Sequence, residues 1–360
     1  MKTRFEVLDI FRGIFSAMVV FFHLSPFADT LILNNEFIRN SDLFVDFFFV
    51  LSGFVIALTY QQRIKASSDI GKFMKKRFFR VYPLHLIMLV IFLIVEVGKH
   101  YLVNYIQVNN LEGPNNNLIT FLSSLFLLNS VKLPGVTDVS WNIPSWSISA
   151  EMISYLLFAV LVYVVSASGN FKKRNLVYAI TVVLAVTLTA LATQSGELTW
   201  SYDYGFLRGI AGFFTGVLCF NLYNARYEAL KNSKSTWFNI AEPVSLIVII
   251  ASVCMASVLK GAGYLYNILF FVAVFVFAFE KGFISNSLKK VEVLKKLGAY
   301  SYSVYMIHAL FISLFNILFI RILHFPATAY SYLFILNFLL IYIAAGWTYR
   351  NIELRFKDLK

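Results

Sequence analysis

Stretches of about twenty apolar residues recur along the whole chain, with short polar stretches between them. A helix needs about twenty such residues to cross the hydrocarbon part of a bilayer. The pattern therefore predicts an all-α fold, a polytopic membrane helix bundle with about ten transmembrane helices. The predicted spans are 9–27, 43–60, 81–101, 147–166, 174–193, 205–223, 240–259, 263–280, 300–320 and 330–349.

The apolar stretch 118–129 is too short to cross a bilayer, and it follows the polar, Asn-rich stretch 104–117. Irregular backbone is tolerated at membrane depth where protein or water surrounds it. We therefore predict a re-entrant segment near 118–129.

Composition supports a membrane protein, since 59% of the residues are hydrophobic, 14% are charged and the mean hydropathy is +0.72. Ordinary soluble domains are less apolar. We expect one membrane-embedded domain over 1–360, with no C-terminal periplasmic domain. Cys219 and Cys254 lie within apolar segments, where cysteine packs as a small hydrophobe. The sequence does not indicate a metal site.

The net charge of +12 is concentrated in a few loops. Lys and Arg accumulate on the cytoplasmic side of membrane proteins, and the stretch 61–80 carries seven of them. If 118–129 does not cross, the alternation of spans also makes both termini cytoplasmic. The charge thus indicates topology. It does not form the solvated basic domain that nucleic-acid binding requires.

The first predicted span carries Arg12 and His23, which are costly in a membrane unless they are functional. Eleven residues correspond to about three helical turns, so the two side chains share one face. His23 is a candidate general base, because imidazole accepts a proton near neutral pH. The alternative for His23 is an ordinary interfacial histidine.

Two carboxylates are expected at a depth similar to that of His23. Asp46 lies near the outer end of the second span, and Glu151 lies about two turns into the fourth. Either could orient an imidazole, as the carboxylate of a catalytic triad orients its histidine, or it could orient a substrate hydroxyl. Asp46 could instead be an interfacial cap or the partner of a nearby basic residue. Trp146 and Ser147 precede Glu151 and are candidate sugar-binding residues, although Trp146 alone could be an interfacial belt residue.

Basic residues before the third span form a candidate phosphate site. Arg77 and Arg80 are three apart, hence adjacent on a helix, and guanidinium groups bind phosphate oxygens bidentately. We assign Lys76 to the same site. The alternative is a cluster that contacts lipid headgroups.

The ninth span places Ser301, Tyr305 and His308 on one face by their spacing. We predict that Tyr305 and His308 contact the donor. The alternative for His308 is a packing histidine with its hydrogen bonds satisfied.

Together these motifs resemble acyltransferase family 3, and the resemblance covers nearly the whole chain. The motifs that carry it are Arg12-x10-His23, Val45-Asp-Phe-Phe-Phe-Val-Leu-Ser-Gly-Phe54, Arg77-x-x-Arg80, Pro144-Ser-Trp-Ser-Ile-Ser-Ala-Glu151, Ser301-Tyr-Ser-Val-Tyr-Met-Ile-His308 and Asn351-Ile-Glu353.

The resemblance implies a multi-pass O-acyltransferase of the bacterial inner membrane. Its donor would be cytoplasmic acyl-CoA, most often acetyl-CoA, and its acceptor an extracytoplasmic or lipid-linked carbohydrate such as O-antigen or exopolysaccharide. We expect Arg77 and Arg80 to hold the CoA phosphates, His23 to act as base, and Arg12 or Tyr305 to stabilise the oxyanion. Two alternatives stay open: a transporter or flippase for a glycan or small anion, and acylation of a non-carbohydrate acceptor.

Overall fold

The computed structural model describes residues 4–102 and 115–357, and every regular element in these two ranges is helical. The α-helices are α1 Glu6–Leu24, α2 Glu36–Arg39, α3 Phe44–Tyr60, α4 Ser67–Leu102, α5 Leu118–Leu125, α6 Trp146–Ala167, α7 Arg174–Thr193, α8 Gly205–Lys231, α9 Ser235–Cys254, α10 Leu265–Phe277, α11 Phe283–Leu288, α12 Glu292–Phe315, α13 Ala327–Tyr330, α14 Phe334–Thr348 and α15 Leu354–Lys357. Two π-helical segments, Asn316–Ile322 and Tyr349–Glu353, extend α12 and α14.

Each of the ten predicted spans coincides with one of these helices, which confirms the all-α membrane bundle. Among the described residues, eight helices are long and apolar enough to cross a bilayer. The other two predicted spans contain α10 and α14, which have only 13 and 15 α-helical residues. The expected number of about ten therefore corresponds to eight full-length spans and two shorter helices.

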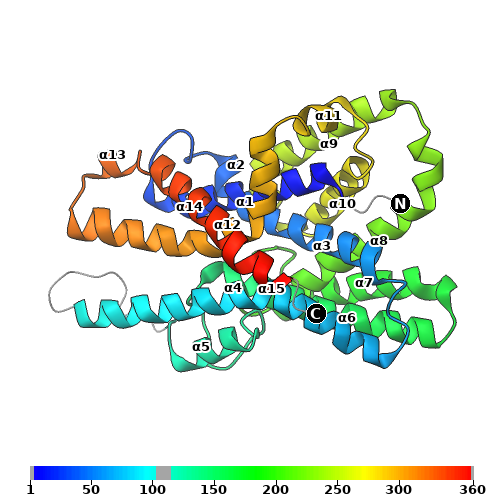
Figure 1. The fold of residues 1–360 in the computed structure, drawn as a ribbon, viewed down its shortest axis with the longest axis horizontal. Helices are drawn as coiled ribbons and strands as arrows, with labels where there is room; N and C mark the ends of the chain where they lie inside the picture. Colours follow the sequence, from blue (N-terminus) through cyan, green and yellow to red (C-terminus); the bar gives the residue numbers. More distant parts are fainter. Residues whose placement is uncertain (1–3, 103–114, 358–360) are drawn as a thin grey trace.

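The helix α4 begins earlier than the third predicted span. It starts at Ser67 and includes most of the basic stretch 61–80, which we expected as a loop. Lys and Arg are good helix formers, and Asp69 lies near the helix start, where a negative charge is favourable. Figure 1 shows α4 along one edge of the bundle with the short α15 packed against it.

The stretch 118–129 contains α5, whose eight residues are too few to cross a bilayer. Its last turn packs against the middle of α4. There the Tyr82 hydroxyl donates to the Leu125 carbonyl at 3.0 Å, and His85 Nε2 lies 2.8 Å from the Ser124 carbonyl. The segment thus enters the bundle without crossing it, as predicted.

Glycines allow two pairs of neighbouring helices to approach closely. A Cβ built on Gly13 of α1 would lie 2.5 Å from the Gly298 nitrogen of α12, and one on Gly53 of α3 would lie 1.8 Å from the Phe213 carbonyl oxygen of α8. Small residues favour such backbone contacts in membranes. Among the helix pairs in the described residues, α1 with α12 and α3 with α8 make the most extensive contacts.

Candidate active site

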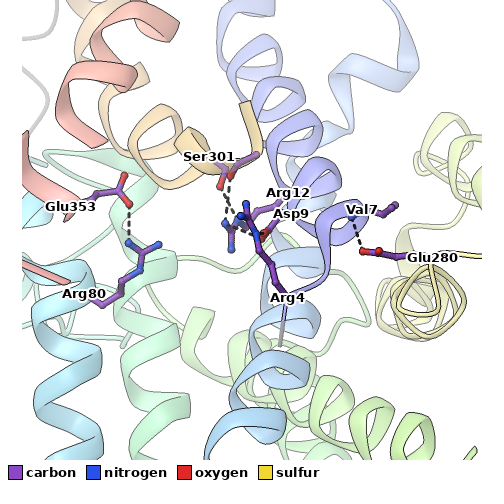
Figure 2. A network of polar contacts seen from close by, with 9 residues as sticks. Arg4, Val7, Asp9, Arg12, Arg80, Glu280, Ser301 and Glu353 are labelled. Atoms are coloured by element: carbon purple, nitrogen blue, oxygen red, sulfur yellow. Dashed lines mark hydrogen bonds and ion pairs between the residues drawn. The ribbon is translucent and has the colours of Figure 1, made fainter. Parts of the chain in front are cut away.

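The N-terminal half of α1 contacts α12 through Arg12. Its Nε donates to the Ser301 hydroxyl at 2.8 Å, its Nη2 donates to the Gly298 carbonyl at 3.4 Å, and it forms an ion pair with Asp9 at 3.3 Å. Figure 2 shows Arg12 and Ser301 pointing toward one another from these two helices. The glycine crossing at Gly13 brings α12 near enough for this contact.

The C-terminal end of α1 contacts α12 through two histidines. His23 Nδ1 lies 3.2 Å from Nε2 of His308, and the ring centroids are 4.9 Å apart. His308 is fully buried, whereas His23 is partly exposed. The face that Arg12 and His23 share on α1 is therefore the face that packs against α12.

A cavity of about 180 Å³ lies between five helices, α1, α3, α4, α6 and α12. Its polar lining is strongly charged and its remaining lining is mostly apolar. The polar and tyrosine residues that line it are Arg12, Ser52, Arg77, Arg80, Ser147, Glu151, Tyr155, Ser301, Tyr302 and Tyr305. Six of the predicted site residues thus line one cavity, namely Arg12, Arg77, Arg80, Ser147, Glu151 and Tyr305.

The arginines of α4 enter this cavity with different partners. Arg80 forms an ion pair of 3.0 Å with Glu353, which also accepts a 2.5 Å hydrogen bond from Ser303; Figure 2 shows the ion pair. Arg77 donates through Nη2 to the Tyr60 hydroxyl at 3.1 Å. Its Nε is buried and has no hydrogen-bond partner in the part of the chain that the structure describes. Lys76 is exposed and is not a lining residue.

Glu151 occupies the α6 side of the cavity. It accepts hydrogen bonds of 2.5 Å from the Ser52 hydroxyl and from the Tyr155 hydroxyl, and these two hydroxyls are 3.0 Å apart. The carboxylate is thereby held in one orientation toward the cavity. A carboxylate held this way can accept a hydrogen bond from a bound substrate.

Asp46 lies on another side of α3 and is bound to Arg208 of α8. The two are 0% and 2% exposed, and Arg208 donates to Asp46 oxygens at 2.6, 3.0 and 3.2 Å. The guanidinium also lies 5.2 Å from the ring centroid of Trp146. Asp46 and Trp146 therefore both contact Arg208, and neither lines the cavity.

Tyr305 links the cavity to the two histidines. The Ser147 hydroxyl and the Tyr305 hydroxyl are 2.9 Å apart, and both residues line the cavity. His308 lies beyond Tyr305 along α12, with its ring centroid 5.9 Å from that of Tyr305. Neither His23 nor His308 lines the cavity. The site thus has two compartments, a charged cavity and a histidine pair.

The structure adds site residues that sequence reasoning did not assign. Ser52 lies within a quoted motif and had no assigned role, yet it holds Glu151 together with Tyr155. Arg208 is a charged residue within the predicted span 205–223, and its partner lies 162 residues away in the chain. Glu353 belongs to a quoted motif, and its contact with Arg80 depends on the π-helical turn at Tyr349–Glu353.

In the described ranges, no three His, Cys, Asp or Glu side chains are grouped so that they could hold a metal ion. The charged groups of the cavity are instead arginines and Glu151. Such a lining fits an anionic organic ligand, because guanidinium groups bind phosphate or carboxylate oxygens.

Comparison with known families decides what this bundle is. The model of an acyltransferase domain matches residues 5–346, nearly the whole chain. The chain belongs to acyltransferase family 3. It is a polytopic membrane protein that transfers acyl groups.

Two curated relatives agree with membership of acyltransferase family 3. Protein 2 in the picA locus of Rhizobium radiobacter is 26% identical over 197 residues, which are 52% of this chain and 95% of that protein. Acyltransferase MdmB of Streptomyces mycarofaciens is 35% identical over 115 residues, which are 32% of this chain and 26% of that protein. No solved structure matches the chain.

Proposed function

We propose that this protein is an O-acyltransferase of the bacterial inner membrane, which moves an acyl group from cytoplasmic acyl-CoA to a hydroxyl of an extracytoplasmic or lipid-linked carbohydrate. Acetyl-CoA is the donor we favour, and O-antigen or exopolysaccharide units are the acceptors. The observation that carries the proposal is the arginine-lined cavity beside the histidine pair of α1 and α12.

The cavity has the chemistry that an acyl-CoA needs. Arg77 and Arg80 follow the basic first turns of α4, the end that the charge rule makes cytoplasmic. The buried, unpartnered Nε of Arg77 favours an anionic group, because an unsatisfied buried donor is costly. In our proposal these arginines hold the phosphates, and the narrow acyl-bearing arm extends past Arg12 toward Tyr305.

The transfer itself requires a base and an oxyanion donor. His23 takes the proton of the acceptor hydroxyl, whose oxygen attacks the thioester carbonyl carbon. The carbon–sulfur bond then breaks, and the proton passes to the leaving thiolate. Arg12 or Tyr305 stabilises the oxyanion of the intermediate. In our proposal the Ser147–Tyr305 hydrogen bond opens so that the thioester can reach His23.

Purified protein in liposomes tests this function. With acetyl-CoA labelled in its acetyl group and an extracted lipid-linked glycan, we expect labelled ester on the glycan and an equal amount of free CoA. Liposomes without protein are the control. Movement of glycan between leaflets without consumption of acetyl-CoA would contradict the enzyme and favour the transporter.

A further inference from the structure

The hydrogen bonds around His308 fix its protonation. Its Nδ1 lies 2.7 Å from the carbonyl oxygen of Tyr305. A carbonyl oxygen only accepts hydrogen bonds, so Nδ1 of His308 must carry a proton. In the neutral ring, Nε2 is then an acceptor, and this is the atom that faces His23.

The same reasoning shows which ring nitrogen of His23 carries the proton. Its Nδ1 lies 2.9 Å from the carbonyl oxygen of Val19 and 3.2 Å from Nε2 of His308. Both neighbours are acceptors, so Nδ1 of His23 is the protonated nitrogen and donates to both. The other nitrogen, Nε2, makes no hydrogen bond within residues 4–102 and 115–357. Its lone pair is therefore available to accept a proton.

We propose that His308 is the positioning residue of His23, and that it fills the place of the carboxylate in a triad. This inference rests on the proposed function, because it gives His23 the role of base. The acceptor nitrogen of His308 holds the His23 ring in the tautomer with a free Nε2. When Nε2 gains a proton, Nδ1–H becomes a stronger donor and the bond to His308 strengthens.

Burial explains why a neutral group can take this part. A carboxylate beside His23 would have to be desolvated, and Asp46, the carboxylate that the sequence suggested for this role, makes its side-chain hydrogen bonds to Arg208. His308 is fully buried and costs less to hold there, because it is uncharged in this arrangement. The pair is thus compatible with a site at membrane depth.

Nitrogen-15 NMR of histidine-labelled protein in lipid nanodiscs tests the arrangement without any activity. The five histidines of the chain are assigned by single substitutions. We expect His23 and His308 both to be neutral, with Nδ1 protonated and Nε2 not. A proton on Nε2 of His308 would overturn the proposal even if the protein transfers acyl groups.

Kinetics provide the second test. His308→Met keeps the size of the side chain and removes the acceptor, whereas His308→Gln keeps a side-chain oxygen that can accept from His23. We expect His308→Met to lower kcat about 10²-fold without changing KM for the donor, and His308→Gln to recover much of that loss. His85→Met, which removes another fully buried histidine, should change only the yield of folded protein.

These outcomes separate the two claims. If the unchanged protein transfers no acyl group, the proposed function is wrong and the NMR result alone judges the histidine pair. If it transfers acyl groups and His308→Met has the kcat of the unchanged protein, the positioning role is wrong and the function stands.

Discussion

Ionisable side chains that lie deep in this bundle have specific partners. Asp46 is bound to Arg208, and Glu353 is bound to Arg80 and Ser303. A buried charge without a partner would be expensive, so these pairs stabilise the charges that the fold encloses. Arg77 is different, because its Nε is buried and has no hydrogen-bond partner among the described residues. It is the group that we expect a ligand to satisfy.

Replacing Arg77 tests this expectation. Arg77→Ala should weaken CoA binding about tenfold or more, since a hydrogen bond to a charged group contributes about 1.5–3 kcal/mol. Isothermal titration of the purified protein with CoA measures the affinity. Arg63→Ala, an exposed arginine of the preceding stretch that does not line the cavity, is the matched control. Equal affinity in the two variants would remove Arg77 from the phosphate site.

The buried pair of Asp46 and Arg208 makes a prediction about stability. Asp46→Asn leaves the Arg208 charge uncompensated and should cost about 3–5 kcal/mol. A thermal unfolding experiment in detergent should show a clearly lower Tm. The double variant Asp46→Leu with Arg208→Met removes both charges and should recover most of the loss. If Asp46→Asn were as stable as the unchanged protein, the pair of Asp46 and Arg208 would not contribute to stability.

At the level of helices, the close crossing of α1 and α12 positions both compartments of the site. One crossing at Gly13 and Gly298 aligns Arg12 with Ser301 and, further out, His23 with His308. The site therefore depends on backbone atoms that carry no chemistry themselves.

Adding a single methyl group at this crossing should disrupt it. Gly13→Ala would place a Cβ 2.5 Å from the Gly298 nitrogen, a backbone atom that has little room to move. We expect a lower Tm by thermal unfolding and a loss of acyl transfer. Gly71→Ala on α4 meets no atom within 4 Å and should be neutral or slightly stabilising. If Gly13→Ala had the Tm and the acyl transfer of the unchanged protein, the close crossing of α1 and α12 would not be required.

The contact between α6 and α12 leads to a prediction about the hydrolysis of acetyl-CoA. Ser147→Ala removes the hydrogen bond to Tyr305 that, in our proposal, closes the cavity toward the histidines. With this barrier weakened, we expect faster hydrolysis of acetyl-CoA in the absence of acceptor, measured as free thiol. Ser154→Ala, which removes a buried serine hydroxyl further along α6, is the control. An unchanged hydrolysis rate would contradict a barrier at this position.

For the whole molecule, the sequence predicted the helices well because each apolar stretch specifies its own helix locally. It predicted the Arg12 and His23 face for the same reason, since helical spacing is local. It could not predict that Asp46 meets Arg208, or that Glu353 meets Arg80, because these partners are brought together only by the packing of distant helices. We did not predict the full length of α4. Its first turns are rich in Lys and Arg, which we took as the mark of a loop, but these residues also favour a helix.

In our proposal, His23 is the base of an acyl transfer whose donor binds in the arginine-lined cavity. The most direct measurement compares label transfer from acetyl-CoA to glycan by the unchanged protein, by His23→Gln and by His100→Gln, an exposed histidine at the far end of α4. We predict that His23→Gln lowers kcat about 10²- to 10⁴-fold while His100→Gln transfers normally. Equal transfer by all three proteins would contradict the claim.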